Sequence, residues 1–120
     1  MTEVDVINKT RSLEVPLRVK NCESFGCRLK GLMFQKGLDL NGGLLMVQKT
    51  ESRTNAAIHM FFVGMDLGIL WLDKAKKIVD SKLAKSWQPM YTPGSPAKYI
   101  LEIHPQRLSE FQIGDQLDFE

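Results

Sequence analysis

The chain has 120 residues, of which 43% are hydrophobic and 25% are charged. A chain of this size and apolar content can bury one core, which excludes a disordered or collagen-like protein and predicts a single domain over residues 1–120. The 16 basic and 14 acidic residues give a formal net charge of only +2, so we expect no nucleic-acid partner.

The N-terminus and the cysteine content bear on the cellular compartment. Residues 1–5 lack the basic and then apolar regions of a signal peptide. The two cysteines, Cys22 and Cys27, are too few for a disulfide framework. We therefore predict a cytoplasmic location, with both cysteines present as free thiols.

The first predicted elements are a β-hairpin and a short helix. Apolar and polar residues alternate in residues 3–6 and again in residues 13–19. This period of two is typical of strands with one buried face, and the polar residues 8–12 between the stretches supply turn chemistry. Ser24 is a suitable N-cap for a helix that runs to about residue 32.

The middle of the chain contains the most apolar stretches. Residues 44–47 and 69–72 are continuous apolar runs of strand length, which predict central strands buried on both faces. Residues 56–72 approach the minimum length for a membrane span, but Asp66 lies within them and has a glycine two residues away on either side. We interpret this segment as two buried strands around a turn and expect no membrane insertion.

The C-terminal part continues the same pattern. Strands are predicted at residues 78–83, 99–103 and 117–119, a proline-rich loop at 88–96, and one helical turn at 107–111. The expected fold is therefore all-β, or β-dominated with one or two short helices, as an antiparallel jelly-roll-like sandwich or barrel.

Six fragments along the chain carry a family resemblance. They are residues 28–34 (RLKGLMF), 43–47 (GLLMV), 59–63 (HMFFV), 70–73 (LWLD), 97–103 (AKYILEI) and 113–117 (IGDQL). In this order they resemble the family called domain of unknown function 192, over about residues 12–120. The resemblance implies a compact, mostly antiparallel β domain of jelly-roll or barrel-like type and no established activity. Many members of that family look exported.

The chain departs from the family pattern at three places. Gln35 stands where the family commonly has arginine, His59 stands where it often has tryptophan, and His104-Pro105 replaces a glycine-bearing turn. These are polar or aromatic positions of the kind that a shared site would use.

A metal site and a catalytic site are two hypotheses that the residues allow. Cys22, Cys27, His59 and His104 are of the ligand types that zinc takes, but no two histidines are closely spaced, so we expect no metal and no cofactor. Cys27 beside Arg28 could act as a nucleophile with a histidine base. No nucleophile elbow or phosphate-binding loop is present.

The predicted ligand site consists of Arg28, His59, Tyr91 and Gly94. Arg28 offers a fork of donors for a carboxylate or phosphate, and His59 can change its charge near neutral pH. We therefore expect an anionic small molecule to meet Arg28 in a cavity that His59 and Tyr91 also line. In the alternative interpretation, Arg28 pairs with Glu102 or Asp115 and only fixes its loop. Glu102 is otherwise expected to face solvent.

Three functions remain open from the sequence. The first is a non-catalytic module that binds a small ligand or serves as an accessory domain. The second is a small enzyme, hydrolase-like or metal-assisted, with a pocket near His59. The third is a structural or protein-interaction domain.

Overall fold

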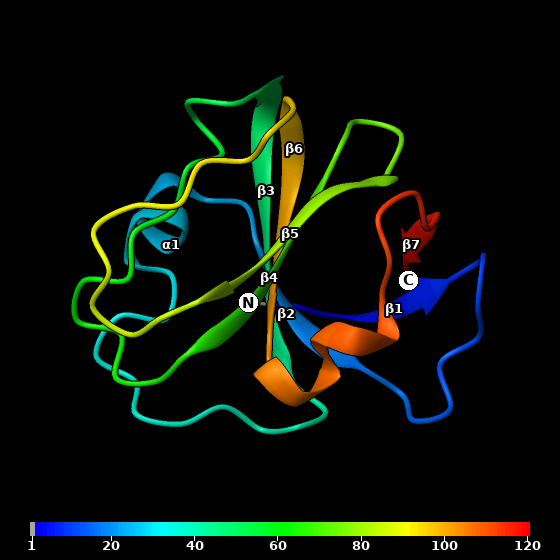
Figure 1. The fold of residues 1–120 in the computed structure, drawn as a ribbon, viewed down its shortest axis with the longest axis horizontal. Helices are drawn as coiled ribbons and strands as arrows, with labels where there is room; N and C mark the ends of the chain where they lie inside the picture. Colours follow the sequence, from blue (N-terminus) through cyan, green and yellow to red (C-terminus); the bar gives the residue numbers. More distant parts are fainter. Residues whose placement is uncertain (1) are drawn as a thin grey trace.

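The structure, a computed structural model, describes residues 2–120 apart from the side chains of Phe25 and Leu29 (Figure 1). Strands make up most of its regular secondary structure. The elements are β1 (Glu3–Asn8), β2 (Arg18–Cys22), α1 (Phe25–Lys30), β3 (Gly43–Ser52), β4 (Leu67–Leu72), β5 (Ile78–Ala84), β6 (Ala97–Ile103), the 3₁₀ helix η1 (Pro105–Glu110) and β7 (Leu117–Phe119). The β-dominated fold with two short helical segments is therefore confirmed. Neither of those segments is long and apolar enough to span a bilayer.

The seven strands form one sheet in the order β5-β4-β6-β3-β2-β1-β7. The sheet curls until its two edges meet beside the turn before β5: Ile78 N donates to Asp115 O at 2.9 Å and Leu117 N donates to Lys76 O at 3.0 Å. The result is a half-barrel, which corresponds to the barrel form of the expected fold. One pairing differs from the antiparallel expectation. β2 and β3 run parallel because α1 and the loop after it carry the chain back to the starting end of β2.

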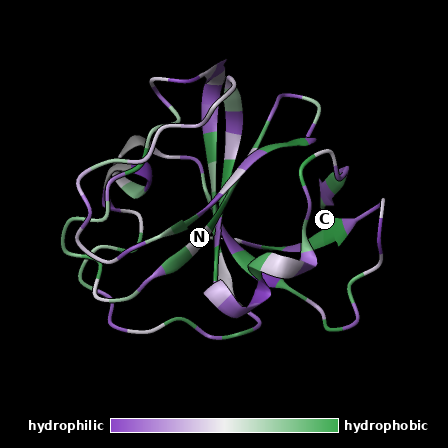
Figure 2. Cartoon of the chain, in the orientation of Figure 1, coloured by the Kyte–Doolittle hydropathy of each residue, from purple (hydrophilic) through white to green (hydrophobic). Residues whose placement is uncertain are grey.

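Side chains on the two faces of the sheet form two cores. β3, β4 and β6 lie in the middle, with α1 and the long loops on one side and η1, β1 and β7 on the other (Figure 1). Alternate residues of a strand point to opposite faces, so each of these strands supplies both cores. The first core includes Met46, Ile69 and Trp71, and the second includes Leu45 and Leu70. All residues of β4 are buried, as expected for a doubly apolar run. In Figure 2 the strands carry stretches of hydrophobic and of hydrophilic colour.

The prediction of a strand over residues 13–19 was correct only at its end. β2 begins at Arg18, and Val15 is 48% exposed. The carbonyl oxygens of Val15 and Pro16 instead accept hydrogen bonds from the buried guanidinium of Arg107, at 2.7 and 3.1 Å. A charged donor from a distant element thus takes the acceptors that a neighbouring strand would have used.

The prediction of two strands in residues 56–72 was also correct only in part. β4 is the second of them, whereas residues 56–66 are irregular except for a single bridge between Ile58 and Tyr91. This irregular segment is held in part by a buried side chain, because the Trp71 indole Nε1 donates to Ala56 O at 2.8 Å.

The cysteine prediction was wrong, because Cys22 and Cys27 form a disulfide. The predicted helix start is confirmed: Ser24 Oγ accepts from Cys27 N at 3.2 Å. This cap folds the first turn of α1 back over the end of β2, so the two Cα atoms lie 5.7 Å apart, a normal separation for a disulfide. The cytoplasmic location was predicted partly because both cysteines were expected to be reduced. That reason no longer holds, and the location stays a prediction.

Candidate functional site

A cavity of about 390 Å³ lies between α1, the outer half of β3 and the irregular segment after it. We call it the α1 cavity. Its walls come from the C-terminal end of α1, from residues 48–50 of β3, from residues 55 and 57–59, and from Glu102 of β6. It lies on the face of the sheet that carries the first core, since Met46 and Ile100 of that core also line it.

Glu102 is the most unusual residue of the cavity. Its register places it opposite Leu44 of β3 and Ile69 of β4, so a carboxyl group stands on an apolar face and is only 4% exposed. Within the described part of the chain its Oε1 has no hydrogen-bond partner. Burial raises the pKa of Glu102 to about 7, because no charge or donor compensates for the lost water.

Gly31 allows the C-terminal end of α1 to lie close to the carboxyl group of Glu102. It ends the helix at φ 51°, a left-handed conformation that favours glycine, and its N–H donates to Cys27 O at 2.8 Å. A Cβ atom at this position would lie 3.9 Å from Glu102 Oε1. The helix therefore ends beside the carboxyl group without placing a side chain against it.

His59 is the second residue with a buried polar atom that lacks a hydrogen-bond partner. Its Nδ1 is buried and lacks a partner, and its ring lies 5.7 Å from the ring of Phe61. Among the buried side-chain nitrogen and oxygen atoms of residues 2–120, those without a partner are His59 Nδ1 and Glu102 Oε1. Both residues line the α1 cavity. The residues with unpartnered polar atoms thus lie around one cavity, as is common in ligand sites.

Positive charge surrounds these two residues. Arg28, Lys30 and Lys49 line the same cavity. Arg28 Nη1 donates to Val47 O at 3.2 Å, which fixes the side chain and leaves most of its donors for other partners. Arg28 pairs with neither acid of the alternative interpretation, since Glu102 Oε1 is unbonded and Asp115 accepts from Arg11 at 2.9 Å.

The structure brings together two of the four residues predicted for the site. Arg28 and His59 line the α1 cavity, whereas Tyr91 and Gly94 are not among its lining residues. The Tyr91 hydroxyl accepts from Lys85 N at 2.9 Å, and Gly94 N donates to Asp80 Oδ2 at 2.8 Å.

Glu102 is the main residue that the sequence reasoning missed, because it was expected to face solvent or to pair with an arginine. The sequence feature that could have indicated its burial is the pair of strands at 44–47 and 69–72, whose residues are apolar on both faces. Glu102 pairs between those strands, opposite Leu44 and Ile69, and is therefore surrounded by apolar neighbours.

The four residues of the zinc hypothesis lie in unrelated settings. The cysteines are joined to each other, and His104 Nδ1 accepts from Gln106 N at 3.1 Å as the cap of η1. In the part of the chain that the structure describes, no three His, Cys, Asp or Glu side chains are grouped so as to hold a metal ion.

A second hollow, of about 900 Å³, lies across α1 from the first and shares Lys30, Gly31 and Leu32 with it. Neither of the two unpartnered atoms belongs to a residue that lines it. The α1 cavity is therefore the stronger candidate site.

Curated relatives cover nearly the whole chain. A UPF0127 protein of Thermococcus kodakarensis is 41% identical over 116 residues, which are 95% of this chain and 72% of the relative. A UPF0127 protein of Thermococcus sibiricus is 36% identical over 96% of this chain and 74% of its own length. One of Pyrococcus furiosus is 32% identical over 95% of this chain and 97% of its own length.

Two crystal structures share the fold. A protein of Sinorhizobium meliloti matches with a TM-score of 0.84 over 98% of this chain and 92% of its own, and a protein of unknown function from Novosphingobium aromaticivorans matches with 0.82 over 97% and 83%. Both are 18% identical in sequence, so they show the fold alone. The family model described as "Uncharacterized ACR" matches residues 6–119, and the chain belongs to this family, domain of unknown function 192.

Proposed function

We propose that the chain binds a small molecule in the α1 cavity without transforming it. The ligand carries an anionic group, which meets Arg28, Lys30 or Lys49, and a polar group that meets Glu102 and His59. The observation that carries the proposal is that both residues with an unpartnered buried atom line one cavity with a basic wall.

The energetics favour an occupant of this kind. A buried polar atom without a partner costs about 1–3 kcal/mol, and two such atoms in one cavity are a cost that a bound ligand can remove. The volume of about 390 Å³ is within the usual range for small-molecule sites. With a pKa of about 7, Glu102 can donate a hydrogen bond when protonated and accept one when ionised.

Binding is favoured over the hydrolase-like alternative. The cysteine considered as a nucleophile, Cys27, is tied up in a disulfide and offers no thiolate. None of the described residues that line the α1 cavity is a serine or a cysteine, the usual nucleophiles of hydrolases.

Calorimetric titration with simple carboxylates, α-amino acids and phosphate monoesters tests the proposal. We expect at least one class to bind, and Arg28→Met and Glu102→Gln each to weaken that binding by at least about tenfold. Lys82→Met, on the exposed part of β5, is the matched control and should bind like the parent chain. Absence of binding by all three classes, or binding that survives both cavity substitutions, would contradict the proposal.

A further inference from the structure

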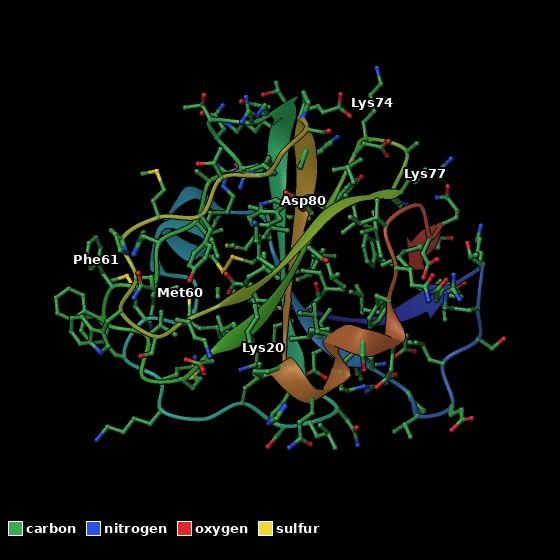
Figure 3. The ribbon with its side chains drawn as sticks, in the orientation of Figure 1. Lys20, Met60, Phe61, Lys74, Lys77 and Asp80 are labelled. Carbon is green, nitrogen blue, oxygen red and sulfur yellow. A yellow bond between two sulfur atoms is a disulfide. The ribbon has the colours of Figure 1, made fainter. Side chains whose placement is uncertain are left out.

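Five large apolar side chains are exposed on the loops beside the α1 cavity. Phe34 is 69% exposed, Phe61 44%, Phe62 46%, Trp87 55% and Met90 66%. We call this group the aromatic tip. The ring of Phe62 lies 5.2 Å from that of Phe34 and 5.0 Å from that of Trp87. In Figure 3, Phe61 lies at one end of the long axis, across the molecule from Lys74 and Lys77. An exposed cluster of this composition marks an interaction surface.

The backbone holds these rings outward at an energetic cost. Phe34, Phe62 and Trp87 have φ angles of 67°, 61° and 67°, in the left-handed region that bulky residues avoid. Each such residue costs about 1 kcal/mol or more. Strain of this kind persists only when the surroundings enforce it and is typical of functional surfaces.

Backbone hydrogen bonds between the three loops enforce the strained conformation. Phe34 N donates to Phe62 O at 2.6 Å, and Trp87 N donates to Met60 O at 2.9 Å. Gly64 N donates to Gln35 O at 3.0 Å. Backbone hydrogen bonds therefore join the loops that contain Phe34, Phe62 and Trp87 into one unit.

Lysines lie next to the aromatic tip. Lys36 follows Phe34 by two residues, and Lys85 precedes Trp87 by two and pairs with Asp66 at 3.4 Å on the surface. The α1 cavity begins beside the tip, because His59 lines that cavity and its ring lies 5.7 Å from the ring of Phe61. Asp66 offsets the charge of Lys85, so Asp66, Lys85 and Lys36 leave the border of the tip with a net charge of +1 from Lys36.

We propose that the aromatic tip docks on the surface of an anionic phospholipid membrane. The Phe, Trp and Met side chains enter the interface between headgroups and acyl chains, where tryptophan and other aromatic rings are stable. Lys36 then lies at the level of the negatively charged headgroups and adds attraction at low salt, whereas Asp66 offsets the charge of Lys85. This peripheral docking needs no spanning helix.

The geometry favours lipid over other occupants. The rings of Phe62 and Trp87 meet at 61°, with an edge against a face, so they form no parallel stack for nucleic-acid bases. The tip lies on loops at an end of the molecule, where side chains can enter a fluid interface without a matching partner surface. The proposal is independent of ligand binding in the α1 cavity.

Binding to vesicles tests the proposal directly, with vesicles of phosphatidylcholine containing phosphatidylserine compared with phosphatidylcholine alone. Trp87 is an intrinsic reporter, because Trp71 is fully buried. We expect sedimentation with the anionic vesicles and a blue shift of the Trp87 emission. Phe34→Asn with Phe62→Asn should lower the partition coefficient at least about tenfold, and asparagine tolerates positive φ, which protects the fold.

Ile113→Asn is the matched control, since Ile113 is 63% exposed and lies outside the tip. It should bind vesicles like the parent chain, and far-UV circular dichroism should be the same for all variants. Lack of binding to the anionic vesicles, or equal binding by the double asparagine variant, would overturn the proposal. A concentration-dependent dimer that the double variant abolishes, without vesicle binding, would assign the tip to a second copy of the chain and overturn it as well.

Discussion

At the scale of single residues, Glu102 sets a testable pH dependence. Its pKa is about 7 in the folded chain against an ordinary value of 4.5, so the folded state holds the proton more tightly than the unfolded state does. Stability is then greatest below about pH 4.5, falls as the pH rises towards 7, and stays low above it. The shift corresponds to about 3 kcal/mol in the free energy of unfolding.

Glu102→Gln should remove this dependence, because the amide does not ionise. Relative to the parent chain, we expect the variant to gain about 3 kcal/mol between about pH 4 and about pH 8 in urea unfolding. Glu14→Gln, at an exposed position, serves as the control and should change little at either pH. A parent chain whose stability is unaffected by pH over this interval would show that the carboxyl group has a partner.

At the scale of elements, the Cys22–Cys27 disulfide fastens α1 to the end of β2. α1 has only six residues and includes a glycine, so it has little helical stability of its own. The bond closes a loop with a sequence separation of 5, for which chain entropy gives about 2 kcal/mol. We therefore expect reduction to lower the free energy of unfolding by about 2 kcal/mol.

Thiol labelling of the denatured chain, before and after reduction, checks the bond itself. The Cys22→Ala/Cys27→Ala variant is the control, and its stability should not respond to the reductant. Two reactive thiols in the chain before any reduction would restore the original prediction of free cysteines.

The elements also show where sequence reasoning succeeds and where it stops. The strands at 44–47 and 69–72 and the cap at Ser24 follow from local patterns, and each is present. The disulfide depends on the direction in which α1 leaves β2, and the late start of the strand predicted at 13–19 depends on Arg107, 91 positions after Pro16. Local periodicity carries no information about such distant partners.

The candidate site was predictable to the same limited degree. Arg28 and His59 could be chosen by their chemistry, and both line the α1 cavity. The burial of Glu102 depends on the strands that pair with β6 on both sides. The positive φ angles of the aromatic tip oppose the intrinsic preference of phenylalanine and tryptophan, so no propensity argument could have found them.

At the scale of the whole molecule, the two cores share the same central strands. Neighbouring residues of β4 belong to opposite cores, since Trp71 packs in the first and Leu70 in the second. Neither core can lose its packing while β4 stays in place, so the half-barrel should unfold as one cooperative unit.

Leu70→Ala tests this coupling across the sheet. The substitution opens a cavity in the second core and should cost about 3 kcal/mol. In a Trp87→Phe background the remaining tryptophan, Trp71, reports the first core alone. We expect the Trp71 fluorescence transition and the far-UV circular dichroism transition to shift together to lower urea, whereas Leu83→Ala, at a position 44% exposed, should shift neither by much. A Trp71 transition that stays in place while the dichroism changes in two steps would show that the two faces of the sheet unfold separately.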